Sequence, residues 1–141
     1  MAVEDEIRQA SEQFYAALNR MINGDPEPMM EVWSHGSDVT AMHPTGGRET
    51  GWEEVRASWE QGAQGSLSDA QVSIEDLVVV PLSDDVAYTL GTERGQATLG
   101  NETAIIDWRV TNIYRREEGE WKMVHHHTDV SPALVEVLKG L

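Results

Sequence analysis

The chain of 141 residues is strongly acidic, with 25 aspartates and glutamates against 10 lysines and arginines and a formal charge of −15 at pH 7. This length suits one domain with a substantial hydrophobic core. A surface of this charge repels nucleic-acid phosphates and anionic lipids, so we expect neither nucleic-acid binding nor membrane attachment. Because the sequence contains no cysteine, disulfides, thiolate metal sites and cysteine nucleophiles are excluded.

The amino-terminal residues contain neither the basic nor the apolar segment of a secretory signal, and no stretch reaches the length of a membrane span. We therefore expect a cytoplasmic protein. No repeat, linker or low-complexity segment divides the chain, so residues 1–141 are predicted to form a single domain.

The first predicted element is a helix over residues 3–22. Its apolar residues recur at three- and four-residue spacing, which places them on one helical stripe. The sequence Asn-Gly-Asp-Pro follows and is typical of the end of a helix. The stripe consists of Val3, Ile7, Ala10, Phe14, Leu18 and Met21.

Residues 28–61 are predicted to form short helices, a strand and a loop. Apolar spacing predicts helices, the sequence VTAMH predicts a strand, and three glycines predict a loop. In the longer helix, Trp52, Val55 and Trp59 share one stripe. The predicted elements are a short helix over residues 28–34, a strand over 39–43, a loop over 44–51 and a helix over 52–61.

From about residue 71 the chain is rich in β-branched and aromatic residues, which predicts four successive antiparallel strands. The last two strands form a long hairpin, and a tail helix follows. Because the helices precede the strands, we predict an α+β domain in which a curved antiparallel sheet wraps over three N-terminal helices as a cone with a pocket at its open end. The strands are predicted over residues 72–80, 86–95, 104–114 and 121–128, and the tail helix over 132–141.

Alternation along the two hairpin arms divides their side chains between two faces. Neither face is purely polar. We therefore expect helices to cover one face and a second subunit to cover the other, which gives a homodimer through the outer face of the sheet. Strict alternation groups Trp108, Val110, Asn112 and Tyr114 on the first arm, and Trp121, Met123, His125 and His127 on the second arm opposite Val124, His126 and Thr128.

Three consecutive histidines end the second arm. His125 and His127 project on the same side and are candidates to share a zinc ion with His43. No further ligand stands at a supporting spacing, so we favour packing or subunit contact and expect no metal site. His126, alone on the other face, is a candidate for hydrogen bonding or proton transfer in a pocket. His43, at a strand end, is either a general base at the pocket mouth or a hydrogen-bonding partner of the following loop.

Two parts of the sequence resemble a known superfamily. Residues 110–127, VTNIYRREEGEWKMVHHH, combine an arginine pair, a glycine turn, a tryptophan and a histidine-containing end, and the loop HPTG at residues 43–46 precedes GWEEVRASW at 51–59. These motifs and the element order are similar to the nuclear transport factor 2-like superfamily, within it the SnoaL-like and ketosteroid-isomerase-like groups. The resemblance implies a single SnoaL-like domain with the cone-shaped, cystatin-like roll. That fold hosts isomerases, cyclases, dehydratases, binding modules and oligomerisation domains.

The resemblance also implies where site residues lie. In the isomerases a base follows the second helix, where this chain has Asp38 and His43, and an oxyanion-hole tyrosine comes from the first helix, where it has Tyr15. Their partner acid lies on the third long strand, where Asp107 faces away from Asn112. The pocket lining implied by the resemblance suits a flat hydrophobic ligand and consists of Trp52, Val55, Trp59, Tyr88, Leu90, Asn112, His126 and Thr128.

The sequence leaves two functions open. The first is a small enzyme without cofactor that moves a proton on a hydrophobic carbonyl compound, with His43, Asp38 or His126 as base and Tyr15 or Asn112 holding the oxygen. The second is a ligand-binding or oligomerisation module with no chemistry. The expected partners are a small hydrophobic molecule and a second copy of the chain.

Overall fold

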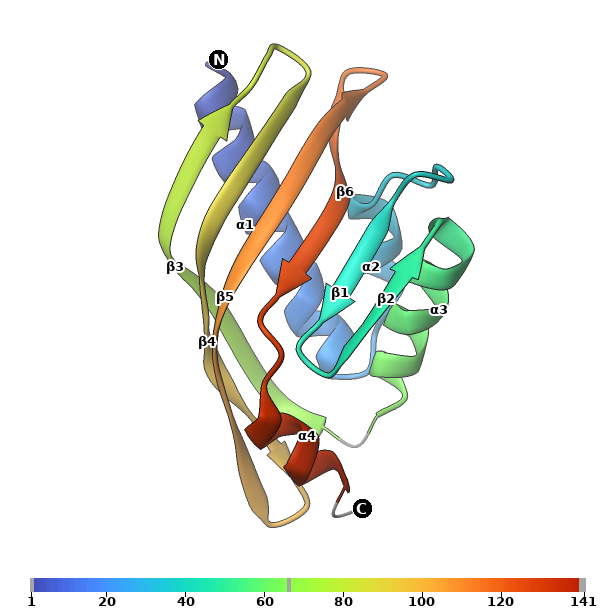
Figure 1. Ribbon diagram of the computed structural model, residues 1–141, viewed down its shortest axis with the longest axis vertical. Helices are drawn as coiled ribbons and strands as arrows, with labels where there is room; N and C mark the ends of the chain where they lie inside the picture. Colours follow the sequence, from blue (N-terminus) through green and yellow to red (C-terminus); the bar gives the residue numbers. More distant parts are fainter. Residues whose placement is uncertain (1, 66, 140–141) are drawn as a thin grey trace.

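The computed structural model describes residues 2–65 and 67–139 and shows a curved six-stranded sheet wrapped around helices on its concave side (Figure 1). The strand order is β2-β1-β6-β5-β4-β3, and neighbours are antiparallel except for β1 and β6. The predicted α+β cone is confirmed. The elements are α1 (Val3–Ile22), α2 (Glu27–Val32), β1 (Thr40–His43), β2 (Gly46–Thr50), α3 (Trp52–Ala63), β3 (Leu67–Pro81), β4 (Val86–Leu99), β5 (Glu102–Glu117), β6 (Glu120–Thr128) and α4 (Pro132–Lys139).

The helix α1 has the bounds that apolar spacing predicted, and it packs against β3, α2 and α3. Its buried side chains include Ile7, Phe14, Leu18 and Met21, which belong to the predicted stripe. Burying each of these side chains stabilises the fold by about 1.5–3 kcal/mol. The amphipathic pattern of the sequence therefore determines which side of α1 faces the sheet.

Asn19 of α1 and Asn23, the residue directly after α1, bind the backbone of the edge strand β3. The Asn19 amide nitrogen donates to the Val72 carbonyl at 2.8 Å, and its oxygen accepts the Val72 N–H at 2.7 Å. Asn23 makes the same pair of hydrogen bonds with Ala70, at 3.0 and 2.8 Å. An edge strand exposes unpaired backbone groups. These four hydrogen bonds satisfy part of that edge and hold α1 against it.

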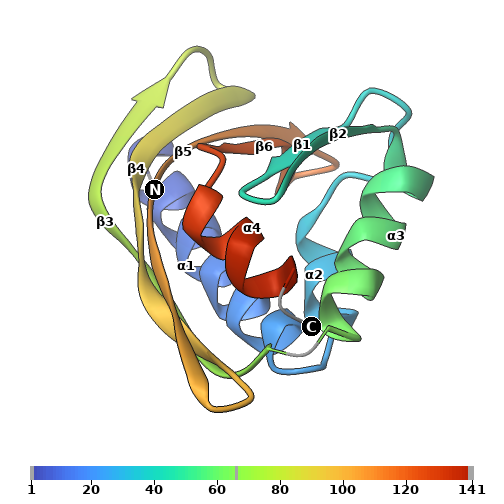
Figure 2. The same cartoon turned by 60° about the horizontal axis from the view of Figure 1, so that its bottom comes forward.

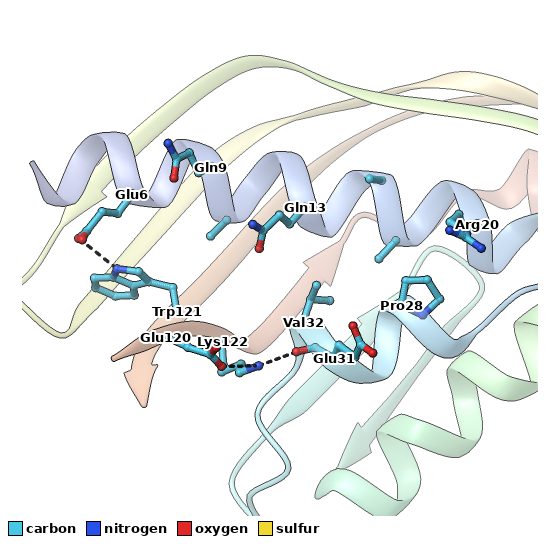
Figure 3. A pocket seen from close by; sticks show the side chains of 13 residues that line it. Glu6, Gln9, Gln13, Arg20, Pro28, Glu31, Val32, Glu120, Trp121 and Lys122 are labelled. Carbon is cyan, nitrogen blue, oxygen red and sulfur yellow. Dashed lines mark hydrogen bonds and ion pairs between the residues drawn. The ribbon is translucent and has the colours of Figure 1, made fainter. Parts of the chain in front are cut away.

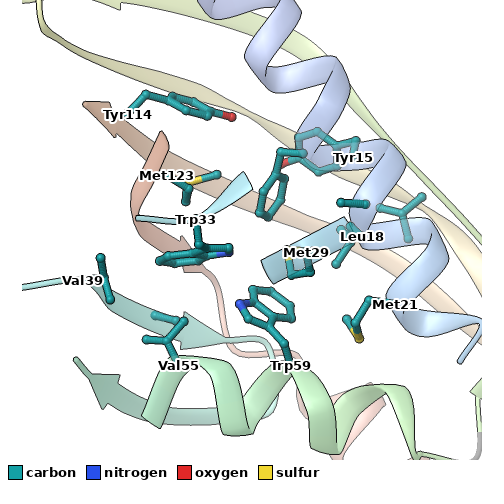
Figure 4. Packing of buried hydrophobic residues seen from close by; sticks show 14 of the residues in the cluster. Tyr15, Leu18, Met21, Met29, Trp33, Val39, Val55, Trp59, Tyr114 and Met123 are labelled. Carbon is teal, nitrogen blue, oxygen red and sulfur yellow. The ribbon is translucent and has the colours of Figure 1, made fainter. Parts of the chain in front are cut away.

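The core between the helices and the sheet is rich in aromatic side chains (Figure 4). Trp33, directly after α2, and Trp59, on α3, have ring centroids 6.1 Å apart, and the Phe14 ring lies 6.3 Å from that of Trp59. The fully buried Met29 and Met123 fill the space around these rings. The flexible thioether side chains suit such irregular gaps between rigid rings.

The segment over residues 44–51, predicted to be a loop, contains the strand β2, which forms a hairpin with β1. Gly46 and Gly47 have φ angles of 96° and 81°, in the left-handed region that glycine adopts without steric cost. The glycines that suggested a loop therefore allow a tightly twisted hairpin. The strand β4 is likewise longer than predicted, since it continues past Gly95 to Leu99.

A β-bulge changes the facing of side chains on β6. Ile113 pairs with His125, but the next residue of β5 pairs with Met123, so Val124 is an extra residue on β6. One extra residue moves the preceding side chains to the opposite face. Met123 is consequently buried in the core on the same side as His126. The expectation that Met123 shares a face with His125 was wrong, because strict alternation takes no account of a bulge.

The ribbon of β3 and β4 bends where two glycines of β4 lie close to β3. A Cβ at Gly95 would overlap the Gln71 carbonyl, and one at Gly91 would lie 2.7 Å from the end of the Ile74 side chain. Two register shifts in the same pair bend it further. Glu93, between the two glycines, lies on the concave side with Ala87 and Thr89 and is buried.

The helix α4 lies across the open end of the cone, between the sheet and the other helices (Figure 2). The predicted tail helix is confirmed over Pro132–Lys139, and its last two residues, 140–141, lie outside the described residues. In the part of the chain that the structure describes, no helix combines the length and the apolar character needed to cross a membrane.

Candidate functional site

A cavity of about 150 Å³ lies inside the open end of the cone, and α1, α3, the sheet and α4 all contribute to its wall. Most of its lining is aliphatic or aromatic. Three titratable side chains reach it from different strands: Glu93 from β4, His126 from β6 and His43 from β1. This convergence of ionisable groups on an apolar cavity makes it the candidate site.

A larger hollow of about 700 Å³ is an open surface groove between α1, α2 and the start of β6 (Figure 3). Its polar side chains lie near solvent and bind one another. The Trp121 indole donates to Glu6 at 3.3 Å, and Lys122 donates to the Glu31 carbonyl at 2.6 Å. We place the site in the smaller cavity because only there are ionisable groups withdrawn from water.

The centre of the site is the buried carboxyl group of Glu93, a residue only 3% exposed. The Tyr15 hydroxyl donates to its Oε2 and the Trp108 indole donates to its Oε1, both at 2.8 Å. Desolvation disfavours the charged carboxylate, while the two donated hydrogen bonds favour it. Burial is the larger effect and raises the pKa of Glu93 above its usual range. The side chain is therefore suited to keeping a proton that an exposed glutamate would lose.

A chain of hydrogen bonds connects Glu93 to His126. The Asn112 amide nitrogen donates to the Tyr15 hydroxyl oxygen at 3.1 Å, so the Asn112 oxygen is free to accept from the His126 Nδ1–H at 2.6 Å. Assigned from this network, the His126 proton is on Nδ1 and Nε2 carries a lone pair. The His126 Nε2 atom lies 4.0 Å from Glu93 Oε2. An acid and a base thus stand next to each other at the cavity wall.

Burial also keeps His126 neutral. Desolvation lowers the pKa of His126 well below its usual value, and the neighbouring His43, His125 and His127 lower it further. A neutral imidazole can accept a proton in a reaction, provided that a negative charge forms beside it at the same time. Glu93 would supply that charge on releasing its own proton.

His43, at the end of β1, lies on the same cavity wall, with its ring centroid 6.2 Å from that of His126. The Ser58 hydroxyl donates to the Val55 carbonyl at 2.7 Å and therefore accepts from the His43 Nε2–H at 3.1 Å. This arrangement leaves Nδ1 as the unprotonated ring nitrogen of His43. Burial lowers the pKa of His43 to about 4, so the ring is neutral at pH 7.

The structure brings five of the residues named from the sequence to this site or directly behind it. His43, His126 and Trp59 line the cavity. Tyr15 and Asn112 reach it through the hydrogen-bond chain that links Glu93 to His126.

Asp38 does not reach the cavity, contrary to its expected role as a base. Its side chain is 60% exposed and accepts hydrogen bonds from Arg115 at 2.7 and 3.2 Å. The Arg115 guanidinium lowers the pKa of this carboxyl. A charged and paired surface aspartate has neither the position nor the protonation behaviour of a buried acid–base group.

The remaining predicted lining residues also lie elsewhere. Leu90 is 42% exposed on the convex face, and Tyr88 shares its facing, because the concave face of β4 is formed by the alternate positions. Trp52 stacks on His35 with centroids 4.2 Å apart. Val55 is fully buried in the core, and Thr128 is buried with its hydroxyl 3.4 Å from the Met42 carbonyl.

The three histidines considered as zinc ligands are not grouped together. The His125 and His127 rings lie 5.8 Å apart, and His125 Nδ1 is 2.6 Å from the Thr40 hydroxyl. His43, the third candidate ligand, instead lines the internal cavity. Across residues 2–65 and 67–139, no three or more histidine, aspartate or glutamate side chains are grouped so that they could hold a metal ion.

Sequence reasoning missed Glu93 and gave Trp108 no role in the site. A signal for Glu93 was present, because Ala87, Thr89, Glu93 and Ala97 stand at even spacings on β4. Small residues on one face with a single large acid among them indicate an inward-facing carboxyl with space beside it. The predicted strand ended at residue 95 and therefore left out Ala97, the last member of this series.

Comparison with known proteins supports the fold. A family model described as a SnoaL-like domain matches residues 7–132. Similar solved structures include a provisionally named dehydratase of the NTF2-like family from Streptomyces avermitilis, with TM-score 0.79, 23% identity and coverage of 92% of this chain and 96% of that one. An NTF2-like superfamily protein from Salmonella enterica has TM-score 0.80 and 15% identity over 91% and 90%. A provisionally named calcium/calmodulin-dependent protein kinase type II association domain from Thiobacillus denitrificans has TM-score 0.72 and 27% identity over 88% and 94%. No curated protein matches the sequence.

Proposed function

Because the chain belongs to the SnoaL-like domain family, we propose that it is an enzyme of the isomerase, cyclase or dehydratase type that moves a proton on a small hydrophobic carbonyl compound. One observation carries the proposal: the buried Glu93 carboxyl and the His126 Nε2 lone pair stand 4.0 Å apart at the wall of an apolar cavity. Such a reaction requires a general acid and a general base that both reach the same substrate. The family relation to a provisionally named dehydratase is consistent with it.

The proposed reaction begins with the substrate carbonyl oxygen bound to the protonated Glu93. His126 Nε2 takes a proton from the carbon next to the carbonyl, and the carbonyl oxygen takes the Glu93 proton. The product of this step is a neutral enol, flanked by an imidazolium and a carboxylate. The imidazolium then returns its proton to a carbon atom, and the enol O–H returns its proton to Glu93, so that the protein is unchanged.

The two proton transfers assist each other. A lone imidazolium in this cavity would be costly, since burial lowers the pKa of His126. The Glu93 carboxylate forms beside it in the same step, and two opposite charges about 4 Å apart attract strongly in a site without water. The hydrogen bonds that Tyr15 and Trp108 donate to Glu93 stabilise its carboxylate form.

The proposal is tested by deuterium exchange. The protein is incubated in D₂O with a panel of small cyclic ketones, and uptake of deuterium beside the carbonyl is followed by mass spectrometry. Wild-type protein should accelerate uptake for at least one ketone. Glu93→Gln and His126→Gln should each reduce the acceleration by about a hundredfold or more. Glu102→Gln, which removes an exposed carboxylate on the same sheet, should leave the rate unchanged.

Two results would count against an enzyme. If no ketone exchanges faster with wild-type protein than in buffer, or if Glu93→Gln exchanges at the wild-type rate, the proton-transfer proposal fails. Ketone binding without exchange would favour the ligand-binding module instead.

We also propose that the protein forms a homodimer through the convex face of its sheet. Three large apolar side chains, Val78, Leu90 and Ile105, are exposed there, and exposed apolar side chains on one face are typical of association surfaces. Sedimentation at several protein concentrations tests this, and Leu90→Arg should shift the equilibrium toward monomer. The cytoplasmic location stays a prediction from the sequence.

A further inference from the structure

The lining of the cavity includes one side chain of α4. Leu134 is 7% exposed and lines the cavity, and α4 lies across the open end of the cone (Figure 2). Ser131 fixes the start of α4: its N–H donates to the Pro44 carbonyl at 2.8 Å, and its hydroxyl accepts from the Leu134 N–H at 3.1 Å. This cap fixes the backbone from which the Leu134 side chain projects.

The cavity is small for a ligand site. A volume of about 150 Å³ equals that of cavities that hold one benzene molecule. Two of its walls are fixed by contacts between lining side chains, since Trp108 donates to Glu93 and Trp59 packs edge-on against His43 with centroids 4.8 Å apart. These rings cannot move apart without loss of packing or of a buried hydrogen bond. Leu134 comes from a peripheral helix that packs chiefly on β5.

The lining of the cavity disfavours an anionic ligand. No lysine or arginine lines the cavity among the residues that the structure describes, and its titratable groups are Glu93, His43 and His126. A bound anion would have no cation to pair with in an apolar surrounding, and its desolvation would be uncompensated. The formal charge of −15 adds long-range repulsion of anions.

We propose that Leu134 sets the size limit of this cavity, and that the site takes an uncharged molecule of about one six-membered ring with one oxygen that accepts a hydrogen bond from Glu93. The inference rests on the site of the proposed function, but it concerns the size and charge of the ligand and not proton transfer. A molecule of two fused rings is excluded by the Leu134 side chain.

Binding of three matched probes tests the inference: cyclohexanone, its two-ring analogue 2-decalone, and the anion cyclohexanecarboxylate. Affinities are measured by protein-observed NMR titration and by quenching of tryptophan fluorescence, since Trp59 and Trp108 line the cavity. Wild-type protein should bind cyclohexanone at least tenfold more tightly than either other probe. Leu134→Ala should gain at least tenfold in affinity for 2-decalone, because it removes the atoms that close the cavity.

The matched control is Leu138→Ala. Leu138 lies one turn later on α4 and packs partly buried against the core without lining the cavity, so this variant should keep wild-type selectivity. If Leu134→Ala does not fold, Leu134→Val removes less volume and should give a smaller gain for 2-decalone.

Three outcomes overturn the inference: no binding of cyclohexanone to wild-type protein, equal or tighter wild-type binding of 2-decalone or the anion, or equal selectivity of the Leu134 and Leu138 variants. Failure of the proposed function is a different result. Cyclohexanone that binds selectively but exchanges no deuterium would refute proton transfer and leave the size limit standing. A two-ring ketone that exchanges deuterium faster than cyclohexanone would refute the size limit and leave proton transfer standing.

Discussion

Acidification should destabilise the protein through His43, and His43→Gln should remove that effect. Glutamine is close to neutral histidine in polarity and keeps an N–H that can donate to Ser58, so the variant mainly removes the titratable ring. The His43 side chain is 15% exposed, and burial lowers its pKa from 6.5 to about 4. Between these two pH values, His43 therefore binds a proton readily in the unfolded chain but not in the folded protein.

The sign and size of the effect follow from this difference in pKa. Above about pH 6.5 both states have a neutral His43, and its contribution to the free energy of unfolding is fully present. As the pH falls toward 4, only the unfolded state gains the proton, so stability is lost. Lowering a pKa from 6.5 to about 4 corresponds to roughly 3 kcal/mol of unfolding free energy, since one pKa unit is about 1.4 kcal/mol.

Urea unfolding at pH 7, 6, 5 and 4, followed by tryptophan fluorescence, measures the effect. The stability advantage of the wild-type protein over His43→Gln should shrink by roughly 3 kcal/mol between pH 7 and pH 4. Carboxylates whose protonation also affects stability, such as Glu6 and Asp38, with their lowered pKa values, act in both proteins and cancel in the difference. His35→Gln, at an exposed position, should give a curve parallel to the wild type. A His43→Gln curve that is also parallel would refute the burial argument.

Three further variants test the architecture. Tyr15→Phe removes a buried donor to Glu93 and should lower the free energy of unfolding by about 1–3 kcal/mol in urea; an unchanged midpoint would show that this hydrogen bond adds nothing. Asp38→Asn should leave any ketone exchange rate within twofold of wild type, and a loss of a hundredfold would return this residue to the site. Gly95→Ala should destabilise the protein by about 2 kcal/mol or more in thermal unfolding, because the added Cβ overlaps the Gln71 carbonyl; a wild-type melting temperature would contradict the close strand approach.

Periodicity located most of the helices and strands. The bounds of α1 agree with the prediction because a helix that buries one stripe must repeat its apolar residues every three to four positions. The hairpin of β5 and β6 was equally visible, since alternation on β5 does place Trp108 and Asn112 on the buried face. The local sequence pattern is sufficient to locate an element and its buried face wherever that face is buried along the whole length of the element.

Patterning failed where the backbone departs from regular geometry. The extra residue Val124 reversed the facing of Met123, and the glycines at 46 and 47 were compatible with either a loop or the strand β2. The facing of Leu90 was transferred from a resemblance and not from the alternation of its own strand. In each case the deciding factor was pairing with another strand, which the local sequence does not contain.

The sequence by itself determined the α+β fold class, the strong acidity of the chain, the helical stripes and the long hairpin, because these follow from composition and periodic burial. Only the tertiary structure decided which ionisable groups leave the solvent. Asp38 and Glu93 are both acidic residues, yet Asp38 pairs with Arg115 at the surface and Glu93 lies buried against Tyr15, 78 positions away in the chain. The groups packed around a carboxyl group shift its pKa, and those groups come from distant strands and helices.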